Sequence, residues 1–448
     1  MTERTEIETQ ATRLEELLKR GDSYELQELV EKVHPSDLAD ILEELDEEQR
    51  LRLIGLLPAS TAGETLAEMD EVEHPEELLA RLKPERIAEV VEEMPDDDAA
   101  DLIGELEPEA QARVLASLED PSTIEELLHY PEDSAGGIMT RELVAVPSFL
   151  TASEALSEIR RQAREVPDFY TIFVVDRQGK LRGVMNLQSL VLADPDQPIA
   201  DVIEDPPAVV PVDMDQEEVG RILSRYNLAA IGVVDPLDRL VGRITFDDAI
   251  DVLEAETTED ILRFAAVSEE EEIRGSTLAA ARSRLPWLVL NLLTALMGAS
   301  VVLLFRDTIE RMVVLAAVMP MIAGLGGNSG TQALAVTIRR IALSDESLVE
   351  RWSVVGKELT VGLINGFFIG SIVAVAGLLL VSDAAFGLVV MLAMWGNLVV
   401  GSTMGSLMPI FLESIGVDPA VASSVFVTAL TDLCGFFLLL GLASALLL

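Results

Sequence analysis

The sequence has little of several residue types, and each scarcity excludes a class of protein. Cys434 is the only cysteine, so an intrachain disulfide and a zinc site built on cysteines are both excluded. The three histidines each lie within two residues of a following proline, as in His34-Pro35, which is typical of helix boundaries rather than metal ligands. There are 32 basic residues against 78 acidic ones, a net charge of −46. This balance argues against nucleic acid or an anionic membrane surface as a partner and favours cations.

The charge is concentrated in one part of the chain. After residue 275 there are eight basic and ten acidic residues, which leaves 24 basic and 68 acidic residues in the first 275. The first part is therefore expected to be soluble, and the second part is apolar. The polar segment Met1–Arg13 lacks the apolar core of a signal peptide, so the soluble half is expected to stay in the cytoplasm.

The soluble half divides into three regions by its periodicity. Residues 1–130 predict short α-helices with an internal repeat, because His34–Leu45 and Lys83–Met94 share a pattern in which proline begins a helix. Stacked helical repeats predict a superhelical domain. Residues 131–245 predict an α/β domain, and residues 246–275 predict an acidic helix that leads to the membrane.

The α/β region contains two copies of one unit. Short β-type runs at 169–175 and 229–234 both end in Val-Val-Asp. A glycine-containing turn, a second strand and a helix follow each run, so the copies lie about sixty residues apart. Duplicated units of this kind usually pack against each other.

Residues 276–448 predict an all-α transmembrane domain. Basic residues precede its first apolar stretch and lie between the second and third, whereas the loop around Asp383 has none. This distribution places the soluble half and the second-to-third loop inside the cell and the C-terminus outside. Five stretches are long and apolar enough to span a bilayer, at about 286–305, 313–337, 358–381, 385–411 and 420–447.

Two features inside these stretches suggest a cation path. Asp432 is the only acid in the apolar stretch Val425–Leu448, where an unpaired carboxylate costs on the order of several kcal/mol. It either faces water or an ion, or it lies near a wet helix end, or burial keeps it neutral. The second stretch contains Gly324–Gln332, whose glycines indicate a helix break or close packing, with Asn328 and Gln332 offering amide groups.

Three motifs together resemble the MgtE family of magnesium channels and transporters. They are Tyr130–Thr140 (YPEDSAGGIMT), Gly326–Gln332 (GGNSGTQ) and Thr431-Asp432 in the last stretch. The order of the regions is also similar, so the resemblance covers essentially the whole chain. It implies a homodimer in the cell membrane, a tandem pair of CBS domains at 131–245, and a pore-plugging helix at 246–275.

The resemblance also implies roles for particular residues. Asp432 would hold a hydrated Mg²⁺ in the pore, which suits an ion that sheds water reluctantly. The implied pore-lining or structural residues are Asn328, Gln332, Gly326, Gly327 and Gly435. Mg²⁺ inside the cell would bridge acidic surfaces of the soluble half and close the pore, and the implied ligands are Asp97, Asp101, Asp247, Asp248, Asp251, Glu256, Glu259, Asp260 and Asp418.

A nucleotide site is a further hypothesis. The second α/β unit has the Gly-x-x-Thr-x-x-Asp pattern of CBS sites in Gly242–Asp248, whereas the first unit lacks its aspartate. ATP is therefore a possible ligand, with Tyr170, Thr245 and Asp248 as its candidate contacts. The alternative is that both segments are ordinary strand-to-helix turns.

Other functions remain open at this point. A transporter of another divalent ion such as Mn²⁺ or Co²⁺ is the main alternative, because oxygen ligands do not exclude these ions. A membrane sensor without transport would need neither Asp432 nor the polar second stretch. An enzyme is not expected, since an intramembrane aspartyl protease needs two acids and only Asp432 lies deep in a span.

Overall fold

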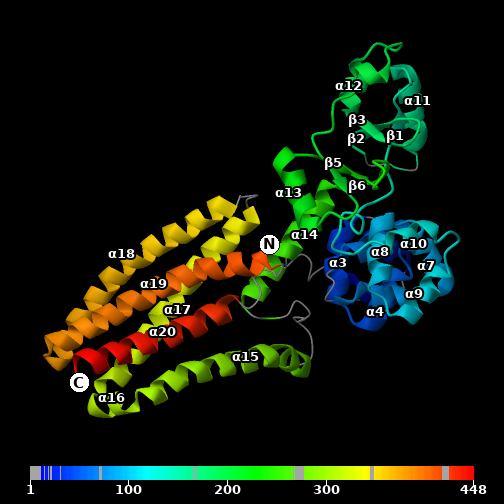
Figure 1. The fold of residues 1–448 in the computed structure, drawn as a ribbon. Coiled ribbons are helices and arrows are strands. Elements are labelled where there is room, and N and C mark those ends of the chain that lie inside the picture. Colours follow the sequence, from blue (N-terminus) through cyan, green and yellow to red (C-terminus); the bar gives the residue numbers. More distant parts are fainter. Residues whose placement is uncertain are drawn as a thin grey trace. The chain divides into compact units, whose positions relative to one another are not determined.

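The computed structural model describes residues 12–69 (except 15, 19, 21, 22 and 31), 73–164, 166, 169–265, 267, 277–343, 348–415 and 423–448. The chain forms two compact units, Met1–Glu256 and Thr257–Leu448 (Figure 1).

Short helices build the first part of the Met1–Glu256 unit. The predicted role of proline is confirmed, because Pro35 and Pro84 each begin a helix, where a missing N–H costs nothing. The leucine and isoleucine side chains that recur at three and four spacing, such as Leu38 and Ile41, are fully buried. The helices are α2 (Ser23–Val30), α3 (Pro35–Glu43), α4 (Glu47–Ile54), α5 (Ala59–Ala67), α6 (Pro75–Ala80), α7 (Pro84–Val91), α8 (Asp96–Gly104), α9 (Pro108–Leu115) and α10 (Ser122–Leu127).

The second part of this unit has two three-stranded sheets with the same topology, which confirms the predicted duplication. In each sheet a short first strand pairs parallel with the second, and the second pairs antiparallel with the third. The sequence reading missed the short first strands, which are three residues long. The elements are β1 (Ala145–Pro147), α11 (Ala152–Gln162), β2 (Thr171–Val175), β3 (Leu181–Asn186), α12 (Leu187–Leu192), η2 (Ile199–Asp201), β4 (Val209–Pro211), α13 (Gln216–Tyr226), β5 (Ala230–Val234) and β6 (Leu240–Thr245).

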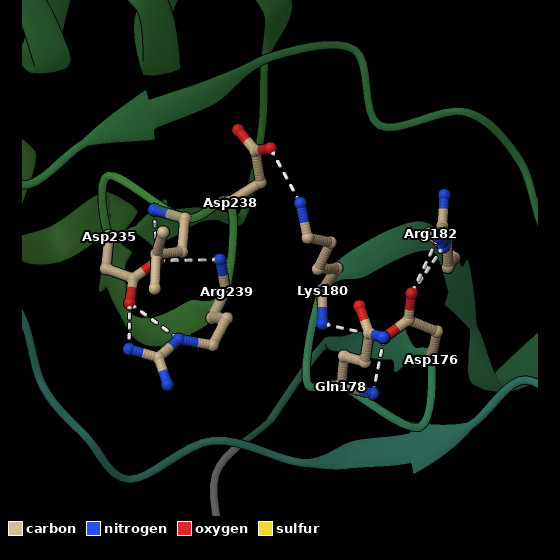
Figure 2. A network of polar contacts seen from close by, with 8 residues as sticks. Asp176, Gln178, Lys180, Arg182, Asp235, Asp238 and Arg239 are labelled. Carbon is tan, nitrogen blue, oxygen red and sulfur yellow. Dashed lines mark hydrogen bonds and ion pairs between the residues drawn. The ribbon is translucent and has the colours of Figure 1, made fainter.

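The two copies contact each other through equivalent turns (Figure 2). In each turn an aspartate, Asp176 or Asp235, accepts hydrogen bonds from backbone N–H groups two and four residues ahead, at 2.7–3.1 Å. These backbone bonds lower the pKa of both carboxyls. Lys180 Nζ lies 3.1 Å from Asp238 Oδ2 across the two turns.

The backbone contacts between the turns are reciprocal. The N–H of Leu240 donates to the carbonyl of Gly179 at 3.0 Å, and the N–H of Leu181 donates to the carbonyl of Asp238 at 3.4 Å. Gly179 and Asp238 occupy equivalent positions and both have a positive φ. The expectation that the duplicated units pack against each other is confirmed here.

Helix α14 (Phe246–Phe264) follows β6. It corresponds to the start of the predicted acidic helix and ends earlier than residue 275; residues 268–276, including the Glu269–Glu272 run, lie outside the described part of the chain.

Long apolar helices build the Thr257–Leu448 unit. They are α15 (Thr277–Leu304), α17 (Val314–Leu343), α18 (Leu348–Val381), α19 (Ala384–Ser414) and α20 (Ser423–Leu446), with the short α16 (Arg306–Arg311). Among the described residues four helices are long and apolar enough to cross a membrane: α15, α18, α19 and α20. The polar and glycine residues of Gly326–Gln332 reduce the apolarity of α17, which is not among the four.

Helix α17 is continuous through its glycines, so the alternative of a break is not what the structure shows. A Cβ at Gly330 would lie 2.3 Å from a methyl of Val427, and a Cβ at Gly405 of α19 would lie 2.2 Å from the Gly330 carbonyl oxygen. Only residues without a side chain permit such an approach between helix backbones. Close packing is therefore the observed role of this segment.

Candidate cation sites

Acidic side chains from two distant segments meet inside the Met1–Glu256 unit. Helix α8 begins with three aspartates, and α14 begins with two more followed by Asp251. The two segments lie close enough for their carboxylates to repel each other. We name this group the acidic cluster; its members are Glu68, Asp96, Asp97, Asp98, Asp247, Asp248 and Asp251.

Burial and mutual repulsion both disfavour charge in the acidic cluster. Burial raises the pKa of Asp97 well above its usual range, and the neighbouring Asp98 and Asp248 raise it further. Burial together with Asp248 and Glu68 raises the pKa of Asp98 to about 7. Burial also raises the pKa values of Asp248 and Asp251. The cluster thus has a surplus of negative charge with little solvent to disperse it.

Asp97 has a buried oxygen without a partner. Its side chain is 7% exposed, and its Oδ1 atom has no hydrogen-bond partner among the described residues. A buried carboxylate oxygen left in this state costs free energy unless a proton, water or cation satisfies it. Among the described residues no three or more acidic, histidine or cysteine side chains are arranged to hold a metal ion, so the Asp97 oxygen is an unsatisfied acceptor rather than part of a formed site.

The junction motif Tyr130–Thr140 holds the two acidic segments in place. The Thr140 hydroxyl donates to Asp96 Oδ1 at 2.5 Å, and the N–H of Arg141 donates to the same oxygen at 3.1 Å. Thr140 also exchanges two backbone hydrogen bonds of 2.9 Å with Arg243 of β6, the strand that leads into α14. The motif thus fixes the start of α8 against the start of α14.

The glycines of the junction motif permit its backbone to pass close to neighbouring atoms. A Cβ at Gly137 would lie 2.4 Å from the carbonyl oxygen of Pro131, and a Cβ at Gly136 would lie 2.6 Å from the Tyr130 ring. Neither space can accept a side chain, which gives a physical reason for both glycines.

Not every predicted sensor residue belongs to the acidic cluster. Asp101 is exposed on α8, one turn after Asp97. Glu256 accepts a hydrogen bond of 2.7 Å from Gln216 Nε2, and Glu259 forms an ion pair with Arg263 one turn further along α14. The Asp260 side chain and Asp418 lie outside the described part of the structure.

Three cluster members, Asp96, Asp98 and Glu68, were missed by sequence reasoning. Asp98 was passed over because spacing along α8 favoured Asp97 and Asp101, and spacing alone does not say which side of a helix meets a distant segment. Glu68 lies at the C-terminal end of α5, far in sequence from the other acids. No local signal marks it.

The candidate nucleotide residues are divided between local roles. The Thr245 N–H donates to Asp248 Oδ2 at 3.0 Å, and the Thr245 hydroxyl donates to the same oxygen. Asp248 therefore ties down the residue that precedes α14. Tyr170, just before β2, is 77% exposed, so its ring is free to stack with a ligand.

The Thr257–Leu448 unit contains a buried acid, Glu358, besides the partly buried Asp432. Asp432 is partly buried in α20, and its Cβ lies 3.6 Å from the position of a Cβ at Gly298 of α15. Glu358 lies within the candidate span Trp352–Leu379 and is 7% exposed. The sequence placed Glu358 at the edge of the third stretch, and the longer candidate span Trp352–Leu379 encloses it.

Helix α17 has two different faces. Gly326 and Gly330, four residues apart, are buried against α19, whereas Asn328 and Gln332, also four apart, are exposed. Gly327 is half-buried, and a Cβ on it would lie 4.0 Å from the Thr431 hydroxyl. The single chain thus presents a polar stripe on an otherwise apolar helix.

The sequence matches known families along most of its length. A model described as a divalent cation transporter, MgtE, matches residues 319–442, and the MgtE intracellular N domain matches residues 33–133. The CBS domain matches residues 135–196 and 199–255. The chain is thus of the class of divalent cation transporters with cytosolic CBS domains.

Individual relatives identify the family within this class. The magnesium transporter MgtE of Thermus thermophilus is 37% identical, with 98% of each chain covered. That of Bacillus subtilis is 32% identical over 71% of this chain and 70% of the relative. The chain belongs to the MgtE family.

Solved structures resemble the soluble unit. The cytosolic domain of the Mg²⁺ channel MgtE in complex with ATP is 40% identical, with a TM-score of 0.51 over 54% of this chain and all of that one. The soluble part of a magnesium transporter is 33% identical, with a TM-score of 0.52 over 56% of this chain and 99% of that one.

Proposed function

We propose that this protein is a Mg²⁺ channel or transporter for magnesium uptake whose opening is controlled by intracellular Mg²⁺. The single observation that carries the proposal is the acidic cluster, in which a buried Asp97 oxygen without a hydrogen bond faces a surplus of carboxylates. Mg²⁺ prefers oxygen ligands and relieves repulsion between carboxylates. A cluster of this kind is stable when cations occupy it and strained when they leave.

Helix α14 supplies the connection to the membrane. It begins in the acidic cluster, and its last residue, Phe264, accepts a hydrogen bond of 3.3 Å at its carbonyl from the Ser424 hydroxyl of α20. Helix α20 also contains Asp432. Cation binding at the first end of α14 would therefore change the position of its other end, at the start of the helix with the pore acid.

The pore is proposed to form between two chains. The exposed stripe of Asn328 and Gln332 on α17 is costly toward lipid but suitable toward a water-filled path. A homodimer would place two such stripes and two Asp432 carboxylates around one axis. Few carboxylates and many retained waters suit Mg²⁺, which loses its hydration shell reluctantly.

The remaining architecture follows from this assignment. We place a superhelical domain at 1–130, the CBS pair at 131–245, a connecting plug segment at 246–275 that begins with α14, and the pore domain at 276–448. The pore domain has five spans, α17 being the polar one, with the N-terminal domains in the cytoplasm and the C-terminus outside. The remaining implied ligands Asp101, Glu256, Glu259, Asp260 and Asp418 would take part in the closed state.

ATP is proposed as a second ligand of the soluble unit. The exposed Tyr170 ring and the Thr245-Asp248 pair before α14 are the candidate contacts, and a relative of similar fold binds ATP at its cytosolic domain. Asp248 would serve both this site and the acidic cluster, so nucleotide and Mg²⁺ binding would be coupled.

Flux measurements on the full chain in proteoliposomes test the proposed function. Asp432→Ala should reduce Mg²⁺ flux at least about a hundredfold, since it removes the only acid of α20. Cys434→Ser, two residues further along the same helix, is the matched control and should keep the parent flux. Normal Mg²⁺ flux through Asp432→Ala would disprove the pore assignment. If the parent protein transports Mn²⁺ or Co²⁺ faster than Mg²⁺, that ion and not Mg²⁺ is the transported ion.

A further inference from the structure

Asn397 of α19 lies where three helices of the membrane unit meet. Its side chain is fully buried, and its Nδ2 atom donates a hydrogen bond of 2.9 Å to the carbonyl of Ile322 in α17. Its Oδ1 atom is also buried and has no hydrogen-bond partner among the described residues. An amide in this state is expensive in an apolar unit, so it calls for a reason beyond packing.

Two glycines provide the space for this amide. A Cβ at Gly326 of α17 would lie 2.1 Å from Asn397 Nδ2, and a Cβ at Gly435 of α20 would lie 2.7 Å from the same atom. The amide thus occupies the volume that side chains of both neighbouring helices would otherwise fill. One hydrogen bond and two missing side chains define the distance between α17 and α20 at this level.

Gly435 is one helical turn after Asp432. Residues three apart are neighbours on a helix surface, so whatever fixes Gly435 also fixes the turn that contains Asp432. On the other side, Gly326 lies two residues before Asn328 on the polar stripe of α17. The amide is therefore in contact with both segments assigned to the pore, although it belongs to neither.

We propose that Asn397 is a positioning residue that sets the distance between α17 and α20 and thereby the position of the Asp432 carboxylate. The inference rests on the proposed role of Asp432 in the pore. A filter that recognises a hydrated ion depends on the spacing of its ligands, so a small displacement of α20 should change discrimination between ions more than it changes folding.

The alternative is that Asn397 only fills space. Leucine has a similar size and no polar atoms, so Asn397→Leu removes the interhelical hydrogen bond and also the Oδ1 atom that has no partner. Replacing a poorly satisfied polar group by an apolar one of similar volume is often neutral for stability. A role in packing alone therefore predicts a variant that behaves like the parent.

The test uses the full chain in proteoliposomes and measures Mg²⁺ flux against Ca²⁺ flux. Asn397→Leu should fold as the parent does and lower the Mg²⁺/Ca²⁺ ratio about tenfold. Ser406→Ala is the matched control, because Ser406 is a fully buried polar residue of the same helix whose hydroxyl bonds to carbonyls of its own helix. It should keep the parent ratio.

A second pair of variants covers the case in which Asn397→Leu does not fold. Gly326→Ala should fail to fold because its methyl group would overlap the Asn397 amide. Adding Asn397→Ala removes the overlap, so the double variant should fold but should still lack normal Mg²⁺/Ca²⁺ discrimination. Parent discrimination in either folded variant, Asn397→Leu or the double one, would overturn the proposal.

Cys434 gives a readout that does not depend on the pore assignment. It is the only thiol of the chain and lies between Asp432 and Gly435 on α20. Its rate of alkylation by a maleimide should change about tenfold or more in Asn397→Leu and should stay unchanged in Ser406→Ala. An unchanged rate would show that Asn397 does not position α20, whatever Asp432 does.

Discussion

The two units of the chain use close contact between their elements in opposite ways. In the membrane unit, glycines bring uncharged helix backbones together, as where Gly405 meets the Gly330 carbonyl, and the contact is complete without a ligand. In the soluble unit, the acidic cluster brings like charges together, and that contact is unfavourable until a cation or proton arrives. The helix packing of the membrane unit therefore does not depend on the solution, whereas the repulsion in the acidic cluster depends on the cation and proton concentrations.

The largest expected effect comes from disrupting the close helix packing of the membrane unit. Gly405→Val would push a branched side chain into the Gly330 carbonyl oxygen, where even a Cβ would lie 2.2 Å away. Overpacking of this kind costs about 1–3 kcal/mol or more. We expect loss of folded protein from detergent extracts, measured by size-exclusion chromatography. Gly324→Ala, at a glycine with no atoms near its Cβ position, is the control and should fold normally.

Removing charge from the acidic cluster should keep the protein folded and change its regulation by internal Mg²⁺. Asp97→Asn with Asp98→Asn removes two candidate ligands, so channel activity should persist at internal Mg²⁺ about tenfold above the level that silences the parent. Patch recordings over a Mg²⁺ series measure this shift. Asp120→Asn, in the same helical region but outside the cluster, should leave the curve unchanged. A shift toward lower Mg²⁺ would mean that the acids act only by repulsion.

Protonation of the acidic cluster should relieve part of the repulsion that bound Mg²⁺ would relieve. The pKa of Asp98 in the folded protein, about 7, lies above the ordinary value of 3.8. Its contribution to stability is therefore fully present below about pH 4 and is lost as the pH rises through 7. Calorimetry without Mg²⁺ should show the soluble unit melting at a lower temperature at pH 8 than at pH 5. Asp98→Asn should weaken this dependence, and a melting temperature that rises with pH would contradict the assignment.

The smallest expected effect concerns an exposed ion pair outside both kinds of contact. Lys180→Ala removes the partner of Asp238 across the two equivalent turns, where Asp238 is 81% exposed. Exposed pairs contribute about 0–1 kcal/mol, so thermal unfolding should change by no more than a few degrees. A larger loss would show that the turns depend on this charge rather than on their backbone hydrogen bonds.

The parts of the fold that the sequence predicts are those encoded in local patterns. Proline at helix starts, the duplicated Val-Val-Asp strands and the apolar stretches are each visible within a short segment of sequence. The structure contains the predicted helices and strands, and four of its described helices are long and apolar enough to span a membrane. Asp432 was identifiable because an acid in an apolar stretch is conspicuous. Glu68 and Asn397 were not identifiable, because their importance depends on which distant helix lies opposite them, and no local period encodes that.

The reciprocal contact between the two α/β copies has a consequence for the origin of the chain. Leu240 donates to Gly179 while Leu181 donates to Asp238, so each copy offers the other the same donor and the same acceptor. A single copy with this turn would be complementary to a second molecule of itself. Gene duplication and fusion would then have joined two subunits of an ancestral dimer, in which Asp238 and Gly179 hold the same left-handed backbone at equivalent positions.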